Sequence, residues 1–246
     1  MTLLADTPYG KFMYFGSDCI GQSAARCEFW DPHMRPFLDA VPPGGVFVDV
    51  GASIGFFTVY MARRGVLVSA FEPSREVFDL LSENVKLNGV SDSVSLECVA
   101  LYDKDVELWL ERKWNQYPTL PDGRIDYENT SNSAVLCLVP KGSGVEPCHA
   151  YGKFVGRTFD SYDMRRVDFL KIDTQGCDLR VLLGARETIR RCRPVVCFEN
   201  EPVLTVYHGD SWEGFLSFFS EMGYEPPTFI GGVDFITRPS ESVARG

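Results

Sequence analysis

The fold of this chain is decided by the stretch Val46–Gly55, which reads VFVDVGASIG. Its first half is a short apolar run interrupted by one acid, Asp49, and its second half is a glycine turn leading into a helix-length segment that ends near Arg64. Strand, glycine turn and helix in this order form the first unit of an open α/β sheet. In such sheets ligands bind beyond the carboxyl ends of the strands, so the residues that end the strands are the candidates for function.

Apolar runs and amphipathic segments alternate along the rest of the chain, which predicts parallel strands joined by helices. The further strands predicted in this way are Val66–Phe71, Val94–Val99, Val167–Asp173 and Pro194–Glu199, followed by two closing strands at Tyr224–Ile230 and Val233–Thr237. The predicted helices run from Ser74 to Asn88, from near Cys177, and from Trp212 to Met222. The chain length fits one domain over residues 1–246, with a Rossmann-like core at 45–240.

Two parts of the chain depart from this alternation. Residues 1–44 are predicted to form an N-terminal cap segment, in which Asp31–Pro32 starts a helix that ends near Val41. Residues 106–158 are predicted to form an insertion with a long polar loop at 113–132 and antiparallel strands at Val106–Arg112, Ser133–Val139 and Lys153–Thr158.

Composition excludes several classes of partner. The chain has 24 Lys plus Arg against 34 Asp plus Glu, and a net charge of −10 makes extended nucleic acid an unfavourable partner. No run reaches the roughly 18 apolar residues that cross a bilayer, and Met1–Asp6 does not resemble a signal peptide, so we expect a cytoplasmic protein with no membrane partner. The 8 cysteines form no CxxC pair and are predicted to be reduced core residues, although Cys148–His149 leaves a metal cluster open.

Three predicted strand ends carry acids, Asp49, Glu72 and Asp173. Gly51 and Gly55 let the backbone pass close to a ligand, and the helix amides that follow can bind a carboxylate or a phosphate. Glu72 lies 23 positions beyond Asp49, at the end of the second strand, where an acid can accept hydrogen bonds from both ribose hydroxyls. These residues predict a nucleoside-binding site.

The glycine turn distinguishes between two nucleoside cofactors. Ser53 stands where the dinucleotide motif GxGxxG has its second glycine, and an anionic Asp49 would repel a pyrophosphate. The same acid suits the positively charged methionine end of S-adenosylmethionine (SAM). The sequence therefore favours SAM over NAD, and a nicotinamide reductase is the less favoured alternative.

Motifs along residues 45–200 resemble those of the FkbM-type methyltransferases. They are VDVGASIGFFT at 48–58, AFEP at 70–73, Asn84 to Asn88-Gly89, KIDTQG at 171–176, LGA at 183–185, and Arg193-Pro194 with Glu199. The resemblance implies a class I methyltransferase fold, with a seven-stranded, mostly parallel sheet, an antiparallel last strand and helices on both faces. It also implies SAM above the first two strand ends and methyl transfer to a hydroxyl oxygen, commonly of a sugar or a natural product.

The same resemblance implies roles for single residues. The cofactor-binding residues would be Asp49, Gly51, Ala52, Ser53, Gly55 and Glu72, with Ala100 beside the adenine, and Asp173 would lie near the reacting end. One departure matters: the family often has Glu where this chain has Gln175, so a role for that carboxylate does not transfer.

A hydroxyl is a poor nucleophile and needs a base, a metal ion or another acceptor for its proton. Asp173 and Glu199 end neighbouring strands and are the first candidates, either as base and orienting group or as ligands of a divalent cation. Lys171 joins them if the strand stays regular, and His208 is the second candidate for the base. The alternatives are a cofactor or capping role for Asp173, a structural ion pair for Glu199 and a solvated loop position for His208.

The sequence therefore predicts a SAM-dependent O-methyltransferase whose partner is a small-molecule hydroxyl acceptor. Two alternatives remain open, a ribose 2′-O-methyltransferase of RNA and a protein that binds SAM or a nucleotide without catalysis. Aromatic residues suited to stacking on an acceptor are Trp109, Trp114, Tyr117, Tyr127 and Trp212. A homo-oligomer is also left open, with contact surface offered by the chain past Val41 and by Trp212–Phe219.

Overall fold

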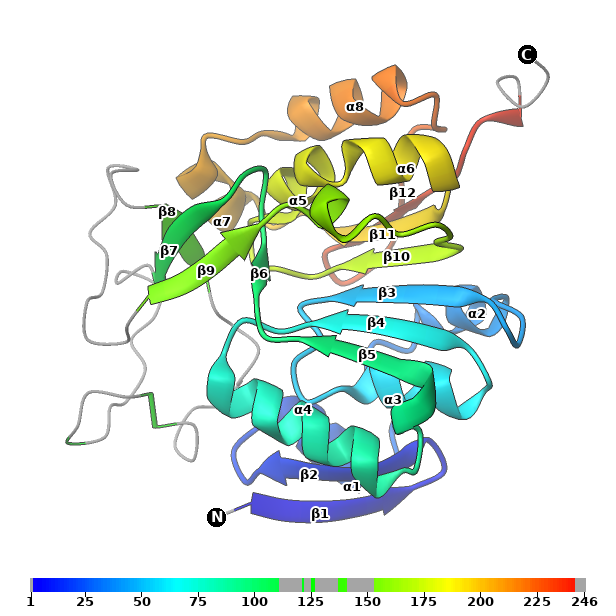
Figure 1. Ribbon diagram of the computed structural model, residues 1–246, viewed down its shortest axis with the longest axis vertical. Helices are drawn as coiled ribbons and strands as arrows, with labels where there is room; N and C mark the ends of the chain where they lie inside the picture. Colours follow the sequence, from blue (N-terminus) through cyan, green and yellow to red (C-terminus); the bar gives the residue numbers. More distant parts are fainter. Residues whose placement is uncertain (1, 111–120, 122–124, 127–136, 141–152, 242–246) are drawn as a thin grey trace.

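The computed structural model describes residues 2–110, 121, 125–126, 137–140 and 153–241. Its centre is a seven-stranded sheet in the order β12-β13-β11-β10-β3-β4-β5 (Figure 1). The strands are β3 (Val46–Val50), β4 (Leu67–Phe71), β5 (Val94–Glu97), β10 (Phe169–Ile172), β11 (Val195–Glu199), β12 (Thr228–Gly231) and β13 (Asp234–Thr237). Only β13 runs against its neighbours, because it pairs antiparallel with both β11 and β12. The predicted Rossmann-like α/β fold with an antiparallel last strand is confirmed.

Helices cover both faces of this sheet. Phe47 packs into the core on the side of α3 (Phe56–Arg63) and α4 (Arg75–Leu87), and its neighbour Val48 packs into the core on the other side. There α5 (Asp178–Gly184), α6 (Arg186–Cys192) and α8 (Trp212–Glu221) supply the apolar side chains (Figure 1). Because the parallel strands are buried on both faces, their sequences are nearly continuous apolar runs, which made them easy to recognise.

A second, smaller sheet lies at the carboxyl-terminal side of the main strands (Figure 1). Its order is β6-β9-β7-β8, formed by β6 (Ala100–Leu101), β7 (Val106–Leu110), β8 (Leu138–Pro140) and β9 (Lys153–Arg157). β7 is antiparallel to β8 and β9, as predicted, whereas β6 pairs in parallel with β9. Most of the predicted loop 113–132 and of the predicted strand 133–139 lies outside the described residues.

The N-terminal segment contains structure that the sequence did not predict. β1 (Thr2–Thr7) and β2 (Gly10–Phe15) form a hairpin, followed by α1 (Cys19–Ala25) and α2 (Arg35–Asp39). The hairpin docks on α4 through Asn84, whose Nδ2 donates to the Met13 carbonyl and whose Oδ1 accepts from the Met13 amide. The helix predicted between Asp31 and Val41 is present as α2, but its predicted start is wrong, because Asp31 has a left-handed φ of 46° that an α-helix cannot contain.

The C-terminal part differs from the prediction in detail. The remaining short elements of the described residues are α7 (Pro202–Thr205) and three 3-10 turns, at Ser91–Ser93, Phe159–Tyr162 and Val206–His208. The first closing strand begins at Thr228 and not at Tyr224, because Pro226 and Pro227 have no N–H to donate to a sheet. Tyr224 instead forms an isolated bridge with Pro239.

The described cysteines are all free, and they follow the core prediction only in part. Cys137, Cys177 and Cys197 are buried, whereas Cys27 and Cys98 are exposed. Cys148 and His149 lie outside the described residues. Among the described helices, none combines the length and the apolar character needed to cross a bilayer.

Candidate functional site

The glycine turn after β3 packs against the loop after β10. Gly51 and Gly55 have left-handed φ values of 76° and 89°, and a Cβ at Gly51 would lie 1.8 Å from the carbonyl oxygen of Asp173. At Gly55 the nearest atom to such a Cβ is Leu81 Cδ1, at 2.4 Å. Glycine is therefore required at Gly51 by the nearby Asp173 backbone and favoured at both positions by their left-handed φ values, in addition to any close approach of a ligand.

Glu72 joins the end of β4 to this turn. Its Oε2 accepts from the Ser53 amide at 3.0 Å, and its Oε1 accepts from the Ser74 amide at 2.9 Å. Burial raises the pKa of Glu72 to about 7, although the two backbone hydrogen bonds act in the opposite direction. A carboxylate has about four lone-pair positions, so Glu72 can still accept hydrogen bonds from a ligand.

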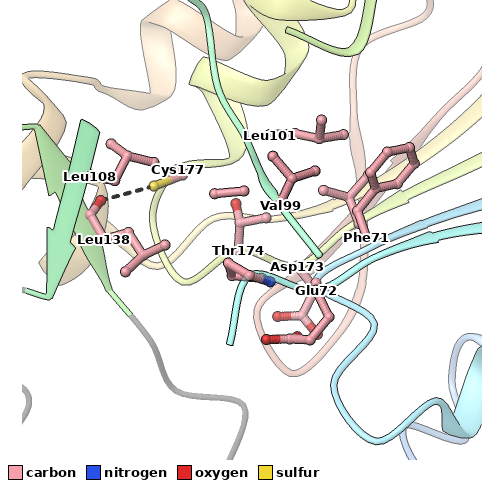
Figure 2. A pocket seen from close by; sticks show the side chains of 13 residues that line it. Phe71, Glu72, Val99, Leu101, Leu108, Leu138, Asp173, Thr174 and Cys177 are labelled. Atoms are coloured by element: carbon pink, nitrogen blue, oxygen red, sulfur yellow. Dashed lines mark hydrogen bonds between the residues drawn. The ribbon is translucent and has the colours of Figure 1, made fainter. Parts of the chain in front are cut away.

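A cavity opens beside Glu72, between the main sheet and the smaller sheet. Figure 2 shows Glu72 and Asp173 at one end of it, and apolar side chains at the other end. The lining residues are Val50, Gly51, Phe71, Glu72, Pro73, Val99, Ala100, Leu101, Leu108, Leu138, Asp173, Thr174 and Cys177. The predicted site residues Gly51, Glu72, Ala100 and Asp173 thus surround one cavity. The walls from Leu108, Leu138 and Cys177 were not predicted.

The other predicted cofactor residues lie just behind this lining. Ala52 donates its amide to the Phe71 carbonyl at 3.0 Å, and Ser53 has a left-handed φ of 50°. The Ser53 hydroxyl is buried and has no hydrogen-bond partner among the described residues. A buried hydroxyl without a partner is unfavourable, so a ligand that forms a hydrogen bond with the Ser53 hydroxyl would be stabilising.

Asp49 is fully buried in β3 and does not line the cavity. Thr58 donates its hydroxyl to Asp49 Oδ2 at 2.7 Å, and Lys171 Nζ lies 3.2 Å from Asp49 Oδ1. The positive partner of Asp49 within the protein is therefore Lys171. A direct contact of Asp49 with a cofactor stays a prediction.

Lys171 lies between two acids. Its Nζ is 3.3 Å from Asp173 Oδ2 as well as 3.2 Å from Asp49 Oδ1, and it lies 5.3 Å from the centre of the Phe57 ring. Burial alone would lower the pKa of Lys171, but the charges of Asp173 and Asp49 raise it above its usual value. Lys171 is thus a permanent cation that holds Asp173 in place, and it cannot act as a base.

Gln175 links the two candidate catalytic acids. Its Nε2 donates to Asp173 Oδ1 at 3.2 Å and to Glu199 Oε2 at 3.0 Å, from a backbone with a left-handed φ of 54°. A Glu at this position would add a third carboxyl group beside the pair, whereas the neutral amide supplies two donors. This geometry explains why Gln is compatible with the site, a role that the sequence analysis left unassigned.

The surroundings of Glu199 favour its neutral form. Burial raises the pKa of Glu199 well above its usual value, and the negative charges of Asp173 and Asp178 raise it further. These surroundings favour the protonated form of Glu199, which can donate a hydrogen bond. Of the two acids, Asp173 is the one suited to accept a proton from a bound hydroxyl.

His208 lies away from these acids. Its ring contacts the Tyr102 hydroxyl at 3.2 Å and the Cys177 sulfur at 3.4 Å, and it is not among the residues that line the cavity. Burial, followed by the charge of Arg180, lowers the pKa of His208 to about 4. The alternative of a solvated loop position for His208 is wrong, because the side chain is buried, and the geometry favours Asp173 over His208 as the base.

The aromatic candidates for acceptor binding are only partly described. Trp212 packs against Phe235, with ring centres 4.6 Å apart, and against Phe198. This places Trp212 in a cluster with core residues. Trp114, Tyr117 and Tyr127 lie outside the described residues.

Comparisons with known proteins identify methyltransferases as relatives of this chain. Residues 49–226 match the methyltransferase FkbM domain. Methyltransferase 1 of Beauveria bassiana (strain ARSEF 2860) is 28% identical over 176 residues, which cover 65% of this chain and 69% of that protein. Methyltransferase sdnD of Sordaria araneosa is 28% identical over 197 residues, which cover 72% of this chain and 74% of that protein.

A solved structure shares the fold. Methyltransferase FkbM from Methylobacillus flagellatus KT has a TM-score of 0.51 and 14% identity, over 79% of this chain and 43% of that one. This chain therefore spans less than half of that protein. Because the domain match covers most of the chain, the chain belongs to the FkbM methyltransferase family.

Proposed function

We propose that this chain transfers a methyl group from SAM to a hydroxyl oxygen of a small molecule, a sugar or a natural-product intermediate. The observation that carries the proposal is the position of Glu72. Its buried carboxylate lies where the glycine turn meets an apolar cavity, with Asp173 on the same cavity. That arrangement offers an acid for ribose hydroxyls, an apolar surface for a base and an anion for a cationic centre.

The residues of the cavity suit the adenosine part of SAM. Val99, Leu101, Leu108 and Leu138 form an apolar wall suited to the adenine ring, with Ala100 beside them. Glu72 has the capacity to bind the ribose, and the unpaired hydroxyl of Ser53 offers a polar contact next to it. When bound, SAM would supply a methyl group already activated on a sulfonium.

The acceptor end would use Asp173 and Glu199 in different roles. Asp173, kept close to Lys171 and bonded by Gln175, would accept the proton of the acceptor hydroxyl. Glu199, protonated, would donate a hydrogen bond that orients the acceptor. Division of two neighbouring acids into a base and a donor is a common result of unequal burial. The chain then has mainly to align the hydroxyl with the methyl group and to exclude water.

Incubation with methyl-labelled SAM and a panel of sugars, phenols and RNA tests the acceptor class. We expect label in a sugar or a natural-product hydroxyl, with mass spectrometry placing the methyl group on oxygen. Label in RNA alone would support the ribose 2′-O-methyltransferase instead, in spite of the net charge of −10. Cofactor binding without product from any class would favour a non-catalytic binder.

A further inference from the structure

A second group of side chains lies next to the acceptor end and has no role in the function proposed above. The segment Asp31–His33 lies against the turn between β12 and β13, and His33 Nε2 is 2.6 Å from Asp234 Oδ2. One ligand atom from each of Asp31, His33 and Asp234 lies within 4.8 Å of the other two. Asp234 pairs with Glu199 in the register of β11 and β13, which places the group beside the candidate acceptor site.

The backbone around this group is shaped to bring the three side chains together. Gly231 has a φ of 147°, and a Cβ there would lie 2.8 Å from His33 Cγ, so the imidazole occupies space that only glycine leaves free. Asp31 has a left-handed φ of 46°, which is unfavourable for a residue with a side chain. Asp31 and Gly231, which are far apart in the sequence, thus both have restricted backbone conformations that bring this cluster together.

Negative charge is in excess at this place. Asp173 and Asp234 both act on Asp31 and on Glu199, and the permanent cation that acts on Asp31 is Lys171. Lys171 is already engaged by Asp49 and Asp173. A bound cation would offset this excess.

We propose that Asp31, His33 and Asp234 bind a divalent transition-metal ion of the Mn²⁺ or Zn²⁺ type. Two carboxylates and an imidazole are ligands for such ions, whereas Mg²⁺ prefers oxygen ligands alone. Three protein ligands would leave further positions of the ion open. The ion would also tie the N-terminal segment to the last two strands. The site does not depend on the proposed methyl transfer.

Calorimetric titration of the metal-stripped full chain with MnCl₂, ZnCl₂ and MgCl₂ tests this site. We expect one saturable site for Mn²⁺ or Zn²⁺, at least about tenfold tighter than for Mg²⁺. Asp234→Asn and Asp31→Asn should each weaken binding by about tenfold or more. Asp6→Asn, on the exposed hairpin near Lys11, is the matched control and should bind like the wild type.

Three results would overturn the proposal. The first is an absence of saturable binding by the wild type, which would leave a plain His33–Asp234 ion pair. The second is unchanged binding in both Asp234→Asn and Asp31→Asn. The third is loss of binding in Glu199→Gln with retention in Asp234→Asn, which would move the ion to the pair of Asp173 and Glu199. Melting curves of the metal-stripped variants test whether each one is folded. If Asp234→Asn is unstable, the metal affinity of Asp31→Asn, on a partly exposed segment, still tests the site.

Discussion

Lys171 lies opposite Asp49 in the parallel register of β10 and β3, and its Nζ is 3.2 Å from Asp49 Oδ1. The same ammonium group is 3.3 Å from Asp173 Oδ2. One buried cation therefore connects the acid below the glycine turn to the acid on the cavity. This connection makes the two ends of the candidate site dependent on each other.

Replacement of Lys171 should destabilise the folded protein. Lys171→Met leaves Asp49 buried and without its cation, so we expect a loss of about 3–5 kcal/mol in the free energy of unfolding, measured with urea. Lys153→Met breaks the exposed pair with Glu107 at 2.8 Å and should cost less than about 1 kcal/mol. Similar small losses for both variants would show that the buried pair contributes little.

Glu72→Gln should weaken cofactor binding. The variant loses the negative charge that accepts hydrogen bonds from ribose. We therefore expect the binding free energy of S-adenosylhomocysteine to weaken by about 1–3 kcal/mol. Glu83→Gln, on the exposed face of α4 near Lys86, is the control and should leave affinity unchanged. Equal affinities for the two variants would remove Glu72 from the cofactor site.

The two acids at the acceptor end should respond differently to amide replacement. Asp173→Asn removes the proposed proton acceptor and should lower kcat by about 100-fold or more, with little change in cofactor affinity. Glu199→Gln keeps a neutral group that can donate a hydrogen bond, so kcat should fall far less. A larger loss of kcat for Glu199→Gln would reverse the proposed roles.

Asp178 should make stability depend on pH. Burial, followed by the charge of Asp173, raises its pKa to about 7 in the folded chain, from a usual value of 3.8. Between these values the folded state binds more protons than the unfolded state, so the contribution of Asp178 to stability falls as pH rises, by up to about 1.4 kcal/mol per pH unit. Asp178→Asn removes this titration.

Urea denaturation of wild type and Asp178→Asn at about pH 5, 6 and 7 measures the effect. The variant should gain stability relative to the wild type as pH rises through this range. Asp163→Asn, at an exposed turn, should keep a constant difference from the wild type. A constant difference for Asp178→Asn as well would mean that Asp178 is ionised in the folded chain.

The sequence was sufficient to predict the sheet and the cluster of acids at its edge. A run such as Val46–Val50 followed by glycines has few other interpretations, and regular alternation along β10 places Lys171 and Asp173 on the same side. Because β10 and β3 are adjacent, this alternation also brings Lys171 next to Asp49 as well as Asp173. Elements with strong local patterns were therefore the predictable ones.

The rest depends on contacts between distant segments. The docking of β2 on α4 relies on a Met13–Asn84 pair separated by 71 residues, and the His33–Asp234 pair is separated by 201. No local pattern encodes such pairs. Leu138, which lines the cavity, likewise comes from an insertion far along the chain from β3 and β4. The low pKa of His208 results from burial that its loop sequence does not reveal.

Calorimetry with S-adenosylhomocysteine and NAD on the wild-type chain tests the central claim most directly. The account predicts saturable binding of one S-adenosylhomocysteine per chain, because the cavity beside Glu72 offers an acid and an apolar wall, and because Ser53 stands where the dinucleotide motif has its second glycine. It predicts no measurable heat from NAD. Binding of NAD with equal affinity, or no binding of S-adenosylhomocysteine, would contradict it.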